Sequence, residues 1–463
     1  MFKARNKETK KYEMDMCSGS ILKKMLLFTV PLMCSSILQL LFNAADVIVV
    51  GSFVGDNALA AVGSNTALIN LLTNFFLGFS IGANVLVARF YGAKQEKELK
   101  ETVHTAIMVS IYSGIALTLI GCIGAKQILI WMKTPKDVLP LATLYLRIYF
   151  IGMTATMLYN FGSAILRAVG DTRRPLYYLT AAGIINVALN LLFVIVLKMS
   201  VAGVALATVI SECISAFLVI RCMRRSEGGI RLEWKSLRIY PQKFLKILQI
   251  GLPASFQGII FSISNVIIQA SVNSFGATVV AGNSAAANIE GFVYVSMNAF
   301  HQAAISFTSQ NIGAAKYERV NKILYTAELC VIVVGIVLGN MAVFFGHPLL
   351  GMYTSSEIVM EAGMKRMGVI AKTYALCGMM DVMVGGLRGV GYSVMPMIVS
   401  LIGACGLRLI WLATVFQIEA YHTVTIVYLS YPITWIITLS VHVLCFVLIR
   451  RKQMREYKCA LAV

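Results

Sequence analysis

The chain has 463 residues, of which 58% are apolar and 13% are charged. Soluble domains average about 45–50% apolar and about 25% charged residues, so both departures indicate lipid as the solvent. The formal charge of +19 would suit a nucleic-acid binder, but the basic residues stand in short clusters between long apolar runs. The composition excludes a soluble enzyme, and the charge pattern speaks against a nucleic-acid partner.

Twelve apolar segments are long enough to cross a bilayer, which takes about 20 residues. The first follows a Lys-rich N-terminus, is too long for a signal-peptide core and lacks an A-x-A site, so we expect it to be retained. We therefore predict an all-α polytopic membrane protein with helices at 25–50, 58–88, 102–125, 139–164, 175–197, 201–222, 245–272, 279–309, 323–346, 364–387, 394–416 and 423–449.

The distribution of Lys and Arg predicts the orientation. An even number of spans puts both termini on one side, and basic residues concentrate on the cytoplasmic side. Of the 40 basic residues, 31 lie in the tails and the even-numbered connections. We therefore expect a plasma-membrane protein with a cytoplasmic N-terminal tail at 1–24, a basic cytoplasmic linker at 223–244 and a cytoplasmic C-terminal tail at 450–463.

The sequence repeats itself at an offset of about 221 residues. Pro31 aligns with Pro253, "RFYGAKQEKELK" with "QNIGAAKYERVN", and "LRAVGDTRRPLY" with "LRGVGYSVMPMI". Each copy holds six predicted helices, so both copies enter the membrane from the same side. This predicts a parallel repeat, with an N-lobe at 25–222 and a C-lobe at 245–449 related by an axis along the membrane normal. Two such lobes around a cleft indicate a transporter that works by alternating access.

Four motifs carry a more specific resemblance: "PLMCSSILQLLFNAADVIVVG", "SIGANVLVARFYGA", "LRAVGDTRRP" and "TSQNIGAAKYERV". Over nearly the whole chain they resemble the bacterial branch of the multidrug and toxic compound extrusion (MATE) family. The resemblance implies a multidrug efflux antiporter that exports amphipathic, often cationic small molecules, coupled to H⁺ or Na⁺. We expect a monomer in the lipid bilayer with no cofactor besides the coupling ion.

Four N-lobe residues have comparable predicted depths in the membrane. Asp46 lies about 31 Å along the first helix, and Asn186 and Asn190 lie about 16 and 22 Å along the fifth. Thr208 lies about 12 Å below the outer end of the sixth helix. These oxygens could hold Na⁺, and Asp46 could equally hold a proton; a proton is the preferred interpretation. The alternative is that Asp46 only extends its side chain to the membrane interface and has no further role.

The family resemblance implies that these same four residues form the coupling cluster and that the first helix bends at Pro31. Many similar transporters have Asp where this chain has Asn190, so the cluster lacks one negative charge. Glu212 follows Thr208 by four residues and shares its helix face. We hypothesise that Glu212 supplies the second titratable group; a structural hydrogen bond between helices is the alternative.

The C-lobe has its own intramembrane polar residues. Ionisable groups there are costly, so we expect Arg408 to form a structural ion pair with Asp381 or Glu290. The seventh helix contains no acid, which speaks against a sodium site in this lobe. The seventh and eighth helices are rich in amides, which predicts a wetted cavity wall for the substrate, although packing between helices explains any single one. The amides concerned include Gln257, Asn265 and Asn288.

Two other functions deserve comparison. A lipid-linked saccharide flippase of a related fold would need a basic cavity, and we interpret only Arg408 as clearly basic within the membrane. A channel or a purely structural membrane protein conflicts with the repeat and with the buried acids. The sequence therefore favours an exporter over both.

Overall fold

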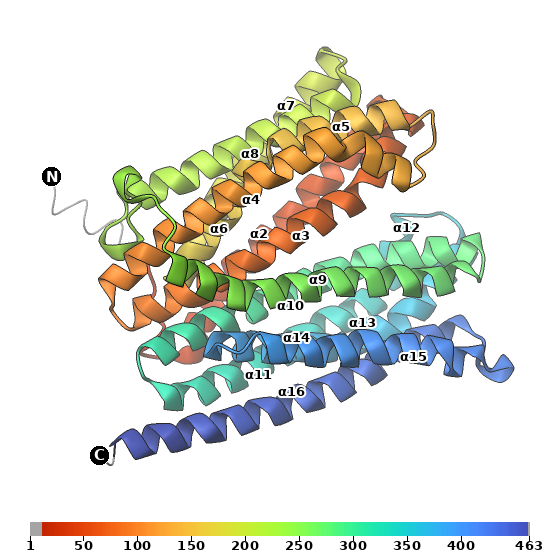
Figure 1. The fold of residues 1–463 in the computed structure, drawn as a ribbon. Coiled ribbons are helices and arrows are strands. Elements are labelled where there is room, and N and C mark those ends of the chain that lie inside the picture. The colour runs from red at the N-terminus through yellow and green to blue at the C-terminus, as the bar shows by residue number, and fades with distance from the viewer. Residues whose placement is uncertain (1–11, 462–463) are drawn as a thin grey trace. The chain divides into compact units, whose positions relative to one another are not determined.

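A computed structural model describes residues 12–461, and every regular element in that range is helical (Figure 1). The remaining residues of the two expected tails lie outside the described part. Helices dominate because lipid offers no partner to backbone groups, which must then bond within their own segment. The first half of the chain contains α2 (Ile21–Phe53), α3 (Asp56–Gly92), α4 (Glu96–Trp131), α5 (Leu139–Ile151), α6 (Met153–Ala168), α7 (Arg173–Leu191) and α8 (Ser200–Arg225).

The second half contains α9 (Pro241–Asn273), α10 (Ala277–Gly313), α11 (Tyr317–Phe344), α12 (Gly346–Gly351), α13 (Glu357–Val390), α14 (Val394–Ser400), α15 (Leu407–Ala413) and α16 (Val424–Leu461). A π-helical turn at Leu192–Val196 continues α7, and a second at Leu401–Gly406 joins α14 to α15. Each of the twelve expected segments coincides with a helical stretch. The all-α membrane fold predicted from the sequence is thus confirmed.

Individual spans differ from the expectation. In the described part of the chain, ten helices are long and apolar enough to cross a membrane, or eleven if the pair α5 and α6 counts as one span. This pair, expected as a single helix at 139–164, bends by 47° around Gly152. Helix α10 has 37 residues but is not among the ten, because its many amides dilute its apolar character.

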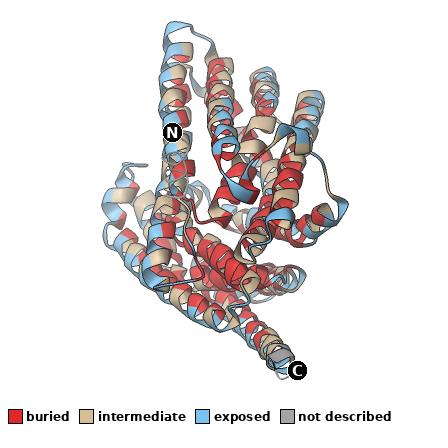
Figure 2. Cartoon of the chain, turned by 90° about the vertical axis from the view of Figure 1, so that its left-hand side faces the viewer, coloured by how far each residue is buried: buried red, intermediate tan, exposed pale blue. Residues whose placement is uncertain are grey.

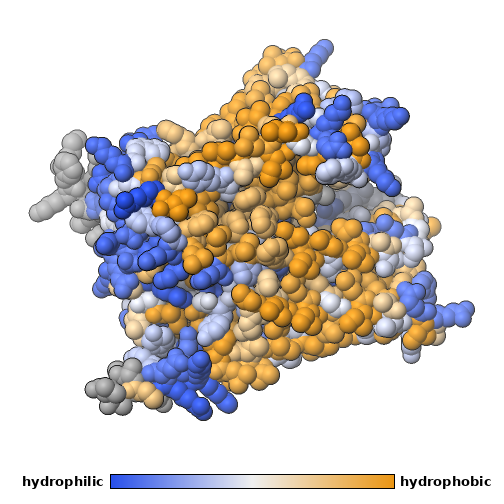
Figure 3. Space-filling view, viewed as in Figure 1, coloured by the Kyte–Doolittle hydropathy of each residue, from blue (hydrophilic) through white to orange (hydrophobic). Residues whose placement is uncertain are grey.

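The surface of the helices matches a lipid environment. Apolar residues cover their middle portions and hydrophilic residues gather at their ends (Figure 3). Buried residues follow the faces that pack against other helices, and exposed ones follow the outer faces (Figure 2). Large apolar side chains such as Phe344 and Ile123 are 81% and 77% exposed, which water would penalise but lipid does not.

The chain forms two compact units whose boundaries differ from those of the expected lobes. The first turns of α2 and of α9 each belong to the other unit than the rest of their helix. Within the described residues, unit 1 comprises 12–15 and Val30–Ser255, and unit 2 comprises Met16–Thr29 and 256–461. Helix α2 therefore begins in unit 2 and enters unit 1 directly before Pro31. Proline lacks the N–H that would bond one turn back, which weakens the helix at this position. Helix α9 changes unit in the opposite direction, two residues after Pro253.

Glycines on α3 allow the first turns of α9 to pack within unit 1. A Cβ at Gly82 would lie 2.3 Å from the carbonyl oxygen of Ile247, and one at Gly78 would lie 2.5 Å from the backbone nitrogen of Ser255. Small residues four apart are a common means of bringing two membrane helices into backbone contact. This contact explains why residues before Phe256 belong to the first unit.

The linker between the halves is helix-free from 226 to 240, apart from two short 3₁₀ turns, and it packs on α4. The backbone N–H of Glu233 donates to His104 Nε2 at 3.1 Å, and that of Tyr240 donates to Thr105 Oγ1 at 3.2 Å. Lys100 forms an ion pair with Glu233 at 2.7 Å. At the other end of the chain, α16 continues through the expected tail to Leu461.

Candidate functional site

Unit 1 contains a small cavity between α2, α7 and α8, with several polar residues on its wall. Its volume is about 60 Å³, enough for one or two water molecules or a small ion. None of the residues that line it is basic, and two are acidic, Asp46 and Glu212. The lining consists of Gln39, Phe42, Asn43, Asp46, Leu179, Ala182, Gly183, Asn186, Thr208, Ser211, Glu212 and Ser215.

Asp46 accepts hydrogen bonds from two other helices. Asn190 Nδ2 donates to Asp46 Oδ1, and Thr208 Oγ1 lies 3.5 Å from Asp46 Oδ2. Asn190 also donates to Asn186 Oδ1 at 3.3 Å, and Asn186 donates to Thr208 Oγ1 at 3.4 Å. The structure thus brings together the four residues expected at comparable depth, in a closed ring of hydrogen bonds.

The four residues hold different positions around the cavity. Asn186 and Thr208 line it together with Asp46, whereas Asn190 is fully buried behind Asp46 and does not line it. The second oxygen of this amide, Asn190 Oδ1, has no hydrogen-bond partner. Donors therefore converge on the carboxylate, an arrangement that suits a negative charge on Asp46.

Glu212 belongs to the same cavity. It lines the wall one helical turn from Thr208, as the spacing of four residues predicted, and its Oε2 is buried without a hydrogen-bond partner. Two carboxylates thus face one cavity with no basic side chain on its wall.

Close packing of α2 on α7 shapes this cavity. A Cβ at Gly183 would lie 1.9 Å from Cε2 of Phe42, so only glycine admits the ring at this distance. Phe42 lies one helical turn before Asp46, and Gly183 lies about one turn before Asn186. The glycine therefore sets the separation at which the carboxylate meets the amides.

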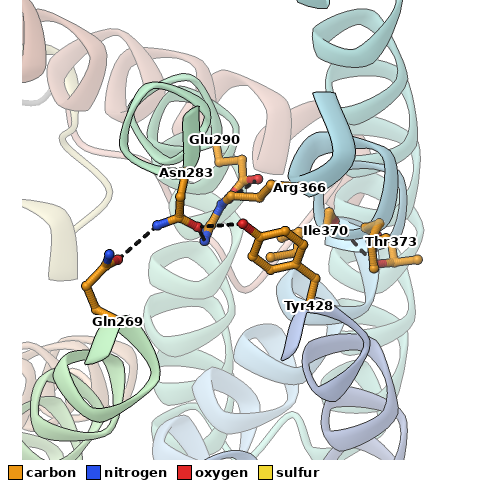
Figure 4. A network of polar contacts seen from close by, with 8 residues as sticks. Gln269, Asn283, Glu290, Arg366, Ile370, Thr373 and Tyr428 are labelled. Carbon is orange, nitrogen blue, oxygen red and sulfur yellow. Dashed lines mark hydrogen bonds and ion pairs between the residues drawn. The ribbon is translucent and has the colours of Figure 1, made fainter. Parts of the chain in front are cut away.

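Unit 2 contains a second polar cluster, centred on an ion pair (Figure 4). Arg366 on α13 donates to Glu290 on α10 from Nε at 3.2 Å and from Nη2 at 2.7 Å. Its Nη1 donates to Asn283 Oδ1 at 2.8 Å, an oxygen that also accepts from the Tyr428 hydroxyl at 3.2 Å. Asn283 in turn donates to Gln269 at 2.9 Å. Every polar end of this cluster has a partner within unit 2.

The expected pairing of Arg408 is wrong. Glu290 pairs with Arg366, and Arg408 makes no ion pair with any residue between 12 and 461. Sequence reasoning missed Arg366 because it placed the start of this helix at 364, whereas α13 begins at Glu357, two turns earlier. Arg366 therefore lies well inside the helix and reaches α10.

The remaining predicted C-lobe residues have separate roles. Gln257 is buried and accepts a hydrogen bond from Arg388 Nη2 at 2.7 Å. Asp381 interacts with the Tyr294 hydroxyl, and its backbone oxygen lies 2.6 Å from His301 Nδ1. Asn265 and Asn288 are exposed in the structure.

Comparison with known proteins identifies the family. The family model described as MatE matches the chain twice, at residues 31–192 and 253–413, which confirms the internal repeat. "Probable multidrug resistance protein YoeA" from Bacillus subtilis (strain 168) is 28% identical over 91% of this chain and 92% of its own length. "Probable multidrug resistance protein NorM" from Thermotoga maritima is 24% identical over 84% of each chain.

Solved structures share the fold. A structure described as the outward-facing conformation of a multidrug resistance MATE family transporter of the MOP superfamily superposes with a TM-score of 0.88. The match covers 96% of this chain and 98% of that one, at 19% identity. A crystal structure described as MATE in the straight conformation superposes with a TM-score of 0.87, at the same identity and coverage.

Proposed function

The chain belongs to the MatE family of membrane transporters, and from this premise we propose that it exports amphipathic, often cationic compounds in exchange for H⁺ or Na⁺. The observation that carries the proposal is the cavity of unit 1, where Asp46 and Glu212 face the same space without a basic neighbour on its wall. Acids without a basic partner inside a membrane protein often mark ion pathways. The names of the two bacterial relatives support multidrug compounds as the cargo.

A proton is the preferred coupling ion. The Asn190 amide turns its nitrogen rather than its oxygen toward Asp46, so the site presents a hydrogen-bond donor at the position where Na⁺ would need an oxygen ligand. Protonation of Asp46 would remove its charge and at least one of its acceptor positions. The hydrogen-bond ring would then rearrange and shift α2 relative to α7 and α8, with the helix yielding at Pro31. Loss of the proton on the inner side would restore the ring.

Sodium is the alternative ion at the same residues. Na⁺ takes hard oxygen ligands, which Asp46, Asn186, Asn190 and Thr208 would supply after the Asn190 amide turns its unpartnered oxygen inward. Glu212 serves either ion as the second titratable group, because it faces the cavity one turn from Thr208. The antiport cycle therefore uses one site for both alternatives.

The test is a flux assay in proteoliposomes with a fluorescent cation as cargo, in which a pH gradient and a Na⁺ gradient are imposed separately. We expect the pH gradient alone to drive export and Asp46→Asn to abolish coupled transport. The matched control is Asp137→Asn, which neutralises an exposed acid outside the helices and should transport normally. Full export by Asp46→Asn would refute the mechanism, and export driven by Na⁺ alone would select the alternative ion.

We further propose that the protein is a monomer in the plasma membrane, with both termini in the cytoplasm. The excess of basic residues in the tails and the linker supports this position of the termini. Cys459 is exposed near the end of α16 and can report this orientation. In a chain whose other cysteines are replaced by serine, a membrane-impermeant maleimide should label Cys459 only after the cells are permeabilised. Labelling of Cys459 in intact cells would show that the C-terminus lies outside the cell and would contradict the proposed topology.

A further inference from the structure

The linker between α8 and α9 is fastened to α4. His104 on α4 is fully buried, and both of its ring nitrogens are occupied. Nδ1 lies 2.7 Å from the backbone oxygen of Lys100, and Nε2 accepts from the backbone N–H of Glu233 at 3.1 Å. Ile230 and Leu232 are 2% and 3% exposed, so one side of the linker is buried. A connection between helices is ordinarily exposed and mobile, whereas this one presents its other side in a fixed arrangement.

The exposed side of the linker carries a tryptophan among basic residues. Trp234 is 55% exposed, although its ring is large and mostly apolar. Arg224 at the end of α8 lies over this ring, 5.5 Å from its centre. The exposed basic residues of the linker itself are Arg231, Lys235 and Arg238. An apolar ring and several cations thus stand together on the surface of unit 1.

This exposed side has an excess of positive charge. The linker and the last turn of α8 contain five basic residues and two acids, Glu227 and Glu233. Glu233 is already paired with Lys100 at 2.7 Å. Glu96 at the start of α4 stands next to Lys97, and both are exposed. The acids nearby are too few to neutralise the basic residues, so a partner with negative charge matches this surface.

The attachment to α4 places the linker at the edge of the membrane. His104, which accepts the N–H group of Glu233, lies at the start of the membrane segment expected at 102–125. Trp234 directly follows Glu233 and so lies near that level. In Figure 3, the hydrophilic surface at this end gives way to apolar surface along the helices. Tryptophan is enriched at the level of the lipid headgroups, and basic residues beside a membrane attract anionic lipids.

We infer that the linker binds the headgroups of anionic phospholipids, such as phosphatidylglycerol, through Arg231, Lys235 and Arg238. These cations donate charge-assisted hydrogen bonds to the lipid phosphate, and the Trp234 ring packs beside them against the first methylenes of the acyl chain. The charge alone would also suit an acidic protein, but the level of Trp234 selects a lipid. None of these residues lines the cavity of unit 1, so the inference does not depend on the exported compound or on the coupling ion.

Quenching of Trp234 fluorescence by brominated lipid can test the contact. Replacing Trp131, Trp411 and Trp435 by Phe leaves Trp234 as the one tryptophan of the full chain. The protein is placed in phosphatidylcholine nanodiscs that contain increasing fractions of phosphatidylglycerol brominated near the headgroup end of one acyl chain. A basic residue near the surface favours an anionic lipid about fivefold. Half-maximal quenching should therefore need an at least about fivefold smaller fraction of this lipid than of equally brominated phosphatidylcholine.

Three controls decide between lipid binding and other causes. Raising the salt concentration from about 0.1 to about 1 M should remove the difference between the two lipids, because the screening length falls from about 10 to about 3 Å. Equal quenching by both lipids would overturn the inference, and so would quenching by neither. Inorganic phosphate, added at constant ionic strength, should leave the quenching unchanged. Relief of the quenching by phosphate would assign the surface to a free anion and overturn the inference as well.

Variants then locate the surface. The triple variant Arg231→Gln, Lys235→Gln and Arg238→Gln should lose the preference for phosphatidylglycerol. The matched control replaces three exposed lysines at the opposite ends of α4 and α8 by Gln and should keep it; these are Lys133, Lys136 and Lys198. If the linker variant fails to fold, the comparison of the two lipids on the unaltered linker still decides. A preference retained by a folded linker variant would overturn the inference.

Discussion

The two units use the carboxylates of their membrane helices in opposite ways. In unit 1, Asp46 and Glu212 face a cavity whose wall has no basic residue, and Glu212 Oε2 has no partner. In unit 2, Glu290 is held by three nitrogen–oxygen contacts to Arg366. An acid that must bind and release an ion needs room and an open charge, whereas an acid that holds helices together needs a fixed partner.

The internal repeat makes this difference informative. With the offset that aligns Pro31 with Pro253, Asp46 corresponds to Ile268, a buried member of the apolar cluster of unit 2. With the offset of 221 that aligns the later motifs, Arg408 corresponds to Val187 and Arg366 to Tyr145. Two copies of one fold have thus acquired different charges at equivalent positions, which fits ion coupling in one copy and leaves the other for different contacts.

The largest expected effect comes from breaking the ion pair of unit 2. Glu290→Gln leaves the Arg366 guanidinium buried without a counter-charge, so we expect a loss of about 3–5 kcal/mol of stability. Thermal unfolding in detergent would measure it. The double variant Glu290→Leu with Arg366→Leu should recover most of the loss. A melting temperature unchanged in the single variant would show that this pair does not hold the unit together.

A charge added to unit 1 should act on transport rather than on stability. Asn190→Asp places a second carboxylate next to Asp46, and two such groups side by side share a proton. We expect the pH at half-maximal transport to rise by about one unit, which corresponds to about 1.4 kcal/mol. A pH profile of proteoliposome flux measures the shift. An unchanged profile would indicate that Asp46 does not carry the coupling ion.

Removal of the second acid should have a smaller effect. Glu212→Gln keeps the shape of the side chain and removes its charge, so we expect transport to continue with a flatter pH dependence. The same flux assay at several pH values tests this, with Glu227→Gln on the linker as the matched control. Transport that keeps the wild-type pH dependence in Glu212→Gln would assign Glu212 a structural role.

The smallest effect is expected for an exposed ion pair, which sharpens the contrast with Glu290. Lys100 donates to Glu233 and holds the pKa of this carboxyl below its ordinary value. The pair thus contributes to folding stability at pH values above the ordinary Glu pKa. This stabilisation is lost as the pH falls through the lowered pKa of Glu233. Hydrogen exchange of residues 226–240 should increase slightly on acidification. In Glu233→Gln this pH response should be weaker, while stability should change little.

Much of the fold could be predicted from the sequence, because apolar length and the repeat determine membrane helices almost by themselves. The N-lobe cluster could also be placed, since a rise of about 1.5 Å per residue puts Asp46, Asn186 and Thr208 at one depth. Arg366 could not, because the helix start expected at 364 put it in the first turn, at the edge of the membrane, whereas α13 begins two turns earlier. The bend at Gly152 and the exchange of helical turns between units depend on tertiary contacts that no local pattern contains.

The exchange at α2 has a consequence for synthesis. Residues 16–29 are made before the rest of unit 2, to which they belong and in which the ring of Phe28 packs edge-on against Phe307 at 5.5 Å. This segment leaves the ribosome long before its partner exists. The first turns of α2 therefore lack their packing partner on α10 until the chain up to Phe307 has been translated. In a nascent chain arrested before α10, the first turns of α2 would not yet have formed their native contacts.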